Sequence, residues 1–470
     1  MKLKLFALFL ATVLLFGGLF GCKKKTDVPA DTDGGSDSSI TDTPREPKPE
    51  DTTDYAALLA FQFEDLIEAP ATDFEYTVSD GAVTVTKYIG TAEKVKIPAT
   101  IEGSPVFALG DGAFLDQNDL KILYVPDGVT AFGKNVLKGC NQLYALRTPF
   151  PQAEGTQFLG YLYGASDYRA NNTAELRVLD FLEIGGSPEK LPSYALYDCN
   201  DLVALKLPST LTSLEPYSLY RCESLKYLNT DHLIKIETHA MDFCLSLEKL
   251  SFADSLESIG LGAFESCRSL RRLTLPFIGE SRDENNYLGY IFGAEQYGFS
   301  KGFYPSSLES VTITNGVDQI GDHSFYECVS LRSVALPDTV TSIGVRAFSG
   351  CSALTSLQLP NGVTSIGESA FSGCSSLSSV TLGNSLTSVG VNAFLNCTSL
   401  TEIALPSTLT ALPNSCFHGC SSLKRVDLGG VSSVGKNTFY GCSSLESVIS
   451  SVPKIKFEDG NQLAEDLLDA

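Results

Sequence analysis

Cysteine is the residue type whose number and spacing first suggest chemistry in this chain. Eleven of the 13 Cys share one sequence phase, and most successive pairs are 22 or 23 residues apart. They are Cys140, Cys199, Cys222, Cys244, Cys267, Cys328, Cys351, Cys374, Cys397, Cys420 and Cys442. Zinc needs four converging ligands, usually from C-x-x-C pairs, whereas this spacing places the thiols along one line. Disulfides between adjacent repeats stay open as an alternative, but the spacing favours buried thiols that fill a small core position.

Histidine is scarce and follows no catalytic pattern. None of His232, His239, His323 and His418 lies in an H-E-x-x-H sequence, and we expect all four on the surface. The chain also has no G-x-S-x-G turn in a credible setting, no glycine-rich phosphate loop and no recognisable pair of glycosidase carboxylates. The sequence therefore predicts no enzyme, no metal site and no cofactor.

Two long gaps interrupt the Cys spacing and contain related aromatic sequences, FLGYLYGA and YLGYIFGA. We place the insertions near residues 148–190 and 276–306. Long loops on rigid scaffolds often carry function, and aromatic side chains are good contact residues. The candidate partner-binding residues are Tyr161, Tyr163, Tyr290 and Phe292. The alternative is that these rings pack each insertion onto its own coil, and the shared sequence supports that structural role at least as well.

The elements that must position all these residues are stacked coils. Segments 343–365, 366–388 and 389–411 share the frame I-G-x-x-A-F-x-x-C-x-x-L-x-x-L-x-L-P, and we count about twelve such units. The final L-x-L alternates like a short strand, and the Pro after it ends the strand. We assign the Gly of the Ile-Gly pair to a turn at positive φ. The pattern predicts an α/β-type repeat solenoid, a leucine-rich repeat with a parallel β-sheet and a mostly irregular convex side.

This frame closely resembles the BspA-type leucine-rich repeat family of bacterial cell-surface proteins. The resemblance covers nearly all of residues 74–457, and the frame recurs many times in phase. It implies exposure at the cell surface, adhesion to host or microbial proteins, and no catalysis. Members differ widely in partner, so the resemblance indicates a matrix or cell-surface protein without naming one.

The N-terminal residues predict export and a lipid anchor. Residues 1–21 combine Lys2 and Lys4 with a long apolar run, as in a signal peptide. The run ends at Leu-Phe-Gly-Cys, which resembles a bacterial lipoprotein signal and implies lipidation of Cys22. The alternatives are an ordinary signal peptide or an uncleaved anchor. We expect an extracytoplasmic protein that is lipid-anchored at the cell membrane or outer surface.

The remaining segments flank the solenoid. Cys22 begins an acidic tether, residues 22–54, whose composition predicts disorder. Residues 55–76 are predicted to form a short helix and a lead-in segment, and residues 77–457 the solenoid with its insertions. Residues 458–470 are predicted to cap the last coil, because terminal repeats expose their core.

The net charge of the chain and the strand residues expected to face solvent limit the possible partners. The formal net charge of −22 makes nucleic acid an unsuitable partner. The expected outward row is small and mostly neutral, so it does not predict a binding site: Lys206, Asn229, Ser251, Thr274, Ala335, Gln358, Thr381, Ala404 and Asp427. We predict a surface-anchored scaffold for protein binding or adhesion. The alternatives are a structural envelope protein without a specific ligand, and an accessory enzyme or inhibitor that acts through the insertions.

Overall fold

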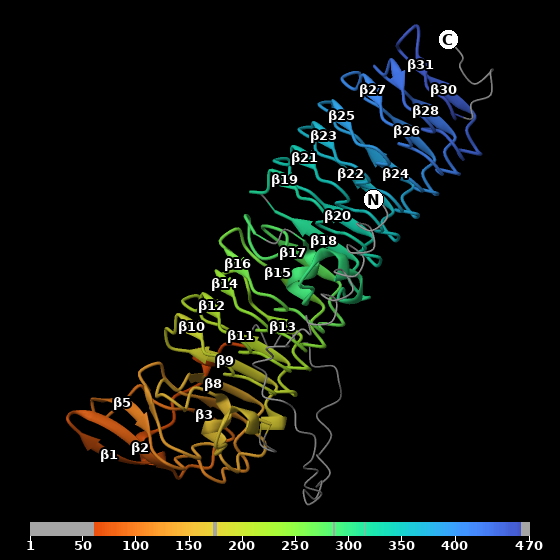
Figure 1. The fold of residues 1–470 in the computed structure, drawn as a ribbon. Coiled ribbons are helices and arrows are strands. Elements are labelled where there is room, and N and C mark those ends of the chain that lie inside the picture. Colours follow the sequence, from red (N-terminus) through yellow and green to blue (C-terminus); the bar gives the residue numbers. More distant parts are fainter. Residues whose placement is uncertain (1–60, 173–175, 285–286, 315, 462–470) are drawn as a thin grey trace, which may run out of the picture. The chain divides into compact units, whose positions relative to one another are not determined.

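Figure 1 shows the chain in a computed structural model, in which short strands and turns repeat in the same order along the sequence. The structure describes residues 61–172, 176–284, 287–314 and 316–461. All of them belong to the compact unit Asp54–Ala470. The predicted signal peptide (1–21), the lipidation site Cys22, the tether (22–54) and residues 462–470 of the predicted cap lie outside the described residues.

The first strand of each coil forms a row of parallel β-structure, which confirms the predicted solenoid. Adjacent strands pair equivalent positions of successive coils, as Leu357 of β22 pairs with Val380 of β24. The solenoid has about 16 turns, more than the frame alone indicated. The row comprises β3 (Lys94–Lys96), β6 (Ile122–Tyr124), β8 (Ala145–Pro149), β9 (Phe181–Gly185), β11 (Ala204–Lys206), β13 (Tyr227–Leu228), β15 (Lys249–Ser251), β17 (Arg272–Leu275), β18 (Ser310–Ile313), β20 (Ser333–Ala335), β22 (Ser356–Gln358), β24 (Ser379–Thr381), β26 (Glu402–Ala404), β28 (Arg425–Asp427) and β30 (Ser447–Ile449).

A second row of two-residue strands follows the Pro turn of most coils. These strands also pair in parallel, as Ile343 pairs with Ile366. The row comprises β10 (Lys190–Leu191), β12 (Ser213–Leu214), β14 (Lys235–Ile236), β16 (Ser258–Ile259), β19 (Gln319–Ile320), β21 (Ser342–Ile343), β23 (Ser365–Ile366), β25 (Ser388–Val389), β27 (Ala411–Leu412), β29 (Ser433–Val434) and β31 (Lys456–Phe457). The segment between this strand and the Cys of the same coil is irregular, and we call it the turn side.

The Gly of the Ile-Gly pair serves close packing, so its assignment to positive φ is wrong. Gly344, Gly367 and Gly390 are absent from the positive-φ residues. A Cβ added at Gly367 would lie 2.6 Å from the carbonyl carbon of Gly344 in the preceding coil. At Gly367 the backbone of the preceding coil leaves no space for a Cβ, although Glu237 and Pro413 hold the equivalent position in other coils.

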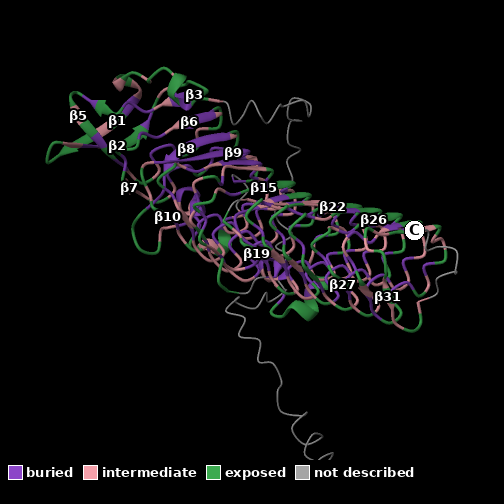
Figure 2. Cartoon of the chain, turned by 90° about the horizontal axis from the view of Figure 1, so that it is seen from above, coloured by how far each residue is buried: buried purple, intermediate pink, exposed green. Residues whose placement is uncertain are grey.

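The core consists of inward side chains, among which Phe at the Ala-Phe position forms a stack. From Phe325 to Phe439, rings of successive coils lie 5.0–5.9 Å apart with interplanar angles of 8–14°. Figure 2 shows buried residues along the inner side of the coils. Offset stacks of this kind add stability beyond the apolar area that the rings bury.

The repeated Cys are buried free thiols, which confirms the prediction of core packing. In nine of these eleven Cys, the Sγ donates to the backbone carbonyl at the Phe position of the preceding coil. Cys351 Sγ lies 3.1 Å from Phe325 O, and Cys374 Sγ lies 3.1 Å from Phe348 O. The thiol therefore fills a small space and also satisfies a buried acceptor, which Ala could not do. Burial raises the pKa of Cys374 to about 12, so this thiol is neutral at physiological pH.

A hairpin closes the stack beside its first coils. β1 (Phe74–Ser79) pairs antiparallel with β2 (Ala82–Tyr88), and β2 pairs in parallel with β5 (Ser104–Leu109). The short strands β4 (Thr100–Ile101) and β7 (Ala131–Phe132) both pair with β5.

The predicted N-terminal helix is not α-helical in its described part. Residues 61–76 contain two 3₁₀ turns, η1 (Phe63–Asp65) and η2 (Ala71–Asp73), before β1 begins. Tertiary contacts replace the helix: Phe63 is buried against the first strand row, and Glu68 forms a parallel bridge with Lys96 of β3. Residues 55–60 lie outside the described residues.

The two predicted insertions contain the remaining short helices. They are η3 (Leu159–Tyr163), η4 (Tyr168–Ala170) and η5 (Leu176–Val178) in the first insertion, and η6 (Leu288–Phe292) and η7 (Tyr297–Gly302) in the second. In the part of the chain that the structure describes, no helix has the length and apolar character needed to cross a bilayer.

Candidate functional site

The second insertion forms a coil of the stack. In a regular coil, the Phe348 N–H donates to Ala370 O of the next coil at 2.8 Å. The Phe264 N–H makes the same bond to Ile291 O at 2.9 Å. Ile291 and Phe292 therefore occupy the Ala-Phe position of their own coil, and the Phe292 ring replaces the usual Phe.

The first insertion follows the same arrangement. The Leu137 N–H donates to Leu162 O at 2.7 Å, so Leu162 and Tyr163 take the Ala-Phe position there. Each of the segments η3 and η6 ends in Gly at positive φ, Gly164 and Gly293, which closes the 3₁₀ turn. The shared L-G-Y sequence is thus a second form of the repeat.

The four predicted partner-binding residues divide into two pairs. Tyr163 and Phe292 are 2% and 0% exposed, which supports the packing alternative for them. Tyr161 and Tyr290 are half-buried at the edge of the core. Burial and the nearby carboxylate of Glu280 raise the pKa of Tyr290 to about 12. A binding role stays a prediction for Tyr161 and Tyr290.

Further aromatic rings, which the sequence interpretation missed, lie on the turn side beside each insertion. Tyr168 stacks on Tyr194 at 4.2 Å, and Tyr297 stacks on His323 at 3.7 Å. Both Tyr stand seven residues after the Tyr of the shared L-G-Y sequence, a signal that could have found them. The second insertion also exposes Phe299, whose side chain is 64% accessible.

The first strand row has a face opposite the core, which we call the outer sheet face. In a three-residue strand the middle side chain points inward and its two neighbours point outward. In β6, Leu123 lies in the main core, whereas Ile122 and Tyr124 belong to a separate cluster on the outer sheet face.

Charged residues at successive register positions connect across the outer sheet face of β6, β8, β9 and β11. The guanidinium of Arg147 lies over the Tyr124 ring, with its Cζ 4.5 Å from the centroid. Its Nε is 3.2 Å from Glu183 Oε1 and its Nη2 is 2.8 Å from Asp127 Oδ1. Lys206 Nζ lies 3.0 Å from the other oxygen of Glu183. Because Arg147 and Glu183 are each 7% exposed, the charges of this network stabilise one another in a largely water-free setting.

Residues 61–66, which we call the covering segment, lie on this part of the outer sheet face. The Phe63 ring is fully buried and stacks on Phe181 with centroids 5.5 Å apart. Glu64 Oε1 lies 3.6 Å from Arg147 Nε, so the segment adds a charge to the network. The outer sheet face therefore buries an irregular chain segment that carries an aromatic side chain.

The same face is open over β24, β26, β28 and β30, where it forms a shallow groove of about 570 Å³. Outward residues in its lining are Ser379, Thr381, Glu402, Ala404, Arg425, Asp427, Ser447 and Ile449. Arg425 and Glu402 form an ion pair across it. Ile449 is 51% exposed and supplies an apolar side chain at one end of the groove.

The stacked coils and their outer sheet face together define a leucine-rich repeat scaffold. The profile of the BspA type leucine rich repeat region matches residues 178–285, 299–424 and 343–459, with six copies. The chain belongs to the BspA-type leucine-rich repeat family. No curated protein matches it by sequence.

Several solved structures are similar to this chain at low identity. A leucine-rich repeat protein from Bacteroides ovatus is 18% identical over 84% of this chain and 99% of its own, with a TM-score of 0.32. A leucine rich cell surface protein from Faecalibacterium prausnitzii is 19% identical over 82% of this chain and 95% of its own, with a TM-score of 0.26. The pneumococcal vaccine antigen PcpA is 17% identical over 85% of this chain and 90% of its own, with a TM-score of 0.28.

Proposed function

We propose that this chain is a surface-located scaffold that binds a protein partner through the open groove on its outer sheet face. Members of the family and its structural neighbours are scaffold or receptor proteins, which supports binding over catalysis. The lipid anchor at Cys22 and adhesion to a host or microbial protein belong to the same proposal, and both derive from the sequence.

The covering segment is the observation that carries this proposal. One end of the outer sheet face already holds a chain segment through a buried ring, Phe63, and a charge, Glu64. The groove over β24–β30 presents comparable groups that a partner protein could contact. They are small residues on its floor, the Glu402–Arg425 ion pair and the exposed Ile449. A partner that inserts an aromatic or apolar side chain over the small residues would bury it in the same way.

A binding assay with a blocked groove tests the proposal. Labelled full-length chain is titrated onto immobilised extracellular-matrix proteins and onto intact host and microbial cells. Thr381→Arg with Ala404→Arg places two long cations in the groove, and we expect the affinity to fall by more than about tenfold. The matched control is Ser388→Arg with Ala411→Arg. These are exposed positions of the second strand row, in β25 and β27, which follow β24 and β26 along the chain.

The outcomes separate the candidate functions. Saturable binding that only the groove variant loses supports the proposal. Equal binding by both variants contradicts the groove, and loss of binding in Tyr290→Ser would then assign the site to the second insertion. Self-association without any foreign partner would favour a structural envelope role.

A further inference from the structure

Two rows of aromatic side chains run along the turn side and change character at His239. In the first row, Tyr194, Tyr217 and His239 occupy equivalent positions of successive coils, all at positive φ. Their rings stack, and the Tyr217 and His239 centroids lie 5.3 Å apart with an interplanar angle of 14°. In the second row, Tyr197 stacks on Tyr220 at 5.0 Å. The stack fixes the plane of the His239 imidazole.

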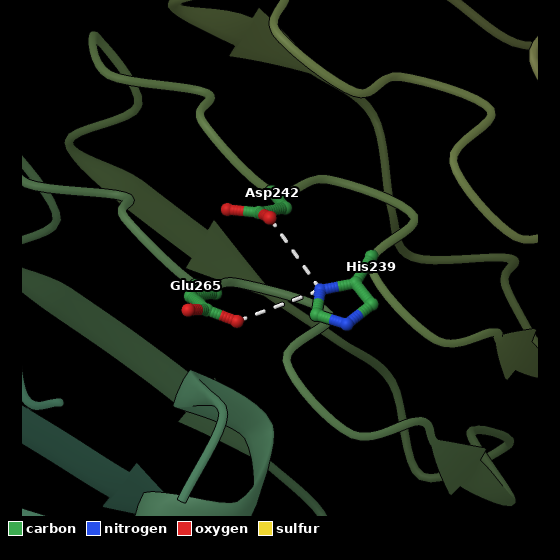
Figure 3. A group of neighbouring side chains, drawn as sticks. All are labelled: His239, Asp242 and Glu265. Carbon is green, nitrogen blue, oxygen red and sulfur yellow. Dashed lines mark ion pairs between the residues drawn. The ribbon is translucent and has the colours of Figure 1, made fainter. Parts of the chain in front are cut away.

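Carboxylates replace the aromatic rings of the second row beside His239. Asp242 and Glu265 stand two residues before the Cys of their coils, the position that Tyr220 holds one coil earlier. Figure 3 shows both carboxylates directed at the Nδ1 of His239. Nδ1 lies 3.4 Å from Asp242 Oδ2 and 3.5 Å from Glu265 Oε2, and the three candidate ligand atoms lie within 4.8 Å of one another.

Asp242 is nearly inaccessible to solvent, which makes its charge costly. The residue is 4% exposed, and its Oδ1 has no hydrogen-bond partner. The Nδ1 of His239 is also buried and makes no hydrogen bond, although one oxygen of each carboxylate lies within 3.5 Å of it. A buried carboxylate so placed is stabilised by a cation.

Glycine leaves space at the point where such a cation would lie. Gly262 occupies the positive-φ position of the next coil, after His239. A Cβ there would lie 2.7 Å from Cε1 of His239 and 3.0 Å from Oε2 of Glu265. Any other residue at position 262 would therefore intrude between the imidazole and the carboxylate. Tyr217 covers the imidazole from the preceding coil, so Nδ1 is held facing the two acids.

The two separations from the imidazole nitrogen match a tetrahedral metal centre, and the third separation, between the two carboxylates, is at most 4.8 Å. Bonds of about 2.0–2.2 Å to His nitrogen and carboxylate oxygen separate the ligands of a tetrahedral zinc ion by roughly 3.3–3.6 Å. The two separations from Nδ1 of His239, 3.4 and 3.5 Å, fall in this range. Imidazole with carboxylate also suits zinc better than calcium, which prefers a larger set of oxygen ligands.

We propose that His239, Asp242 and Glu265 bind one divalent transition-metal ion of the zinc type. Three protein ligands leave a fourth position for water or for a donor atom of a partner. This inference is independent of the proposed groove, which lies on other strands. It departs from the sequence prediction, which assigned His239 to the surface and expected no metal.

Metal titration of the full-length chain tests the site. After chelation and dialysis, Zn²⁺ is titrated calorimetrically, and Co²⁺ is added in parallel because a tetrahedral Co²⁺ centre absorbs strongly in the visible. We expect one Zn²⁺ per chain. His239→Asn, which keeps a residue that tolerates positive φ, should abolish binding, and Glu265→Gln should weaken it by at least about tenfold. Circular dichroism checks that each variant is folded.

His323 provides the matched control. It holds the same positive-φ position as His239 and stacks on Tyr297, but Tyr326 stands where Asp242 stands in the site. His323→Asn should therefore retain full zinc binding. No zinc binding to the wild-type chain, or binding that folded His239→Asn retains, overturns the proposal. The cluster would then be a contact between His239 and its two acids without a metal. Preference for Ca²⁺ over Zn²⁺ would overturn the assignment to a zinc-type ion.

Discussion

Replacing Phe63 by Ala should release the covering segment from the outer sheet face without unfolding the solenoid. The Phe63 ring is fully buried and stacks on Phe181. Burial of a Phe side chain contributes about 2–3 kcal/mol, and an aromatic pair adds roughly 0.5–1.5 kcal/mol. Loss of about 3 kcal/mol from docking would raise the population of the released segment by roughly 100-fold, since each 1.4 kcal/mol is a factor of ten.

Hydrogen exchange at one amide reports this release. The Ala69 N–H donates to Lys96 O at 2.8 Å, where the segment that follows residues 61–66 pairs with β3. We expect exchange at Ala69 to accelerate by roughly 100-fold in Phe63→Ala, while core amides near β22 keep their wild-type rates, because each coil contacts only its neighbours.

A neighbouring variant controls for nonspecific effects. Ile67, directly after the covering segment, is 90% exposed, so Ile67→Ala removes an aliphatic side chain with little loss of burial. Its effect on Ala69 exchange should correspond to no more than about 0.5 kcal/mol. Equal exchange rates in Phe63→Ala and Ile67→Ala would refute the argument that the buried ring holds the segment in place.

Three further predictions concern stability. Arg147→Ala should lower the free energy of unfolding in urea by up to about 3–5 kcal/mol, because the buried Glu183 then keeps only the more exposed Lys206 as a partner; a smaller loss than Lys206→Ala would contradict this. Gly367→Ala should destabilise the fold by about 1–3 kcal/mol in thermal melts, since its Cβ would meet the preceding coil at 2.6 Å, whereas Gly298→Ala, with no atom within 4 Å, should have little effect. Cys374 has a folded pKa of about 12, above the ~8.5 of an unfolded thiol, so the folded state holds its proton more tightly. The stabilisation from this proton is complete below pH ~8.5 and falls by about 1.4 kcal/mol per pH unit above it. In Cys374→Ala, the free energy of unfolding measured in urea should therefore decline less steeply with pH in the alkaline range. The same pH dependence in the variant and the wild type would refute this.

The regular coils were predictable because the role of most residues in the frame follows from their type and from the repeat period. Cys351 and Phe371 recur at one spacing, and their burial follows from that period and from their apolar character. The role of Gly367 was not predictable in this way, because Gly at positive φ and Gly at a close approach look identical in a sequence. Only the spacing between stacked backbones decides between the two.

The outer sheet face was harder to predict, because an insertion separates its partners. Arg147 and Glu183 are 36 residues apart in sequence yet pair directly in register. The frame alone gives no basis for that register, since the first insertion hides one coil. The outward row was accurately predicted as small at Thr381 and Ala404, in the groove, where the frame is unbroken.

The cluster at His239 could have been found by reading across coils. Asp242 and Glu265 are 23 residues apart and hold equivalent positions, so their carboxylates are neighbours once the period is known. His239 is three residues before Asp242 on the same turn. A search for close ligand pairs along the chain misses this set, because a solenoid brings ligands together at the length of its repeat.

The hydrogen bonds of the turn side give the solenoid a direction, and its two ends therefore need different chemistry. Backbone N–H groups at the Phe position donate toward the next coil, whereas the thiols donate toward the preceding one. In the last described coil, the Phe439 N–H donates to the side-chain Oδ1 of Asn461 at 3.1 Å instead of to a backbone carbonyl. The Asn461 amide in turn donates to Gly435 O at 2.9 Å. A shortened array that ends at an earlier coil would leave the Phe-position N–H of that coil without a protein acceptor unless it carried an Asn at the equivalent position. Whole repeats can thus be inserted between existing coils, but the last coil of each array needs a hydrogen-bond acceptor for the N–H at its Phe position.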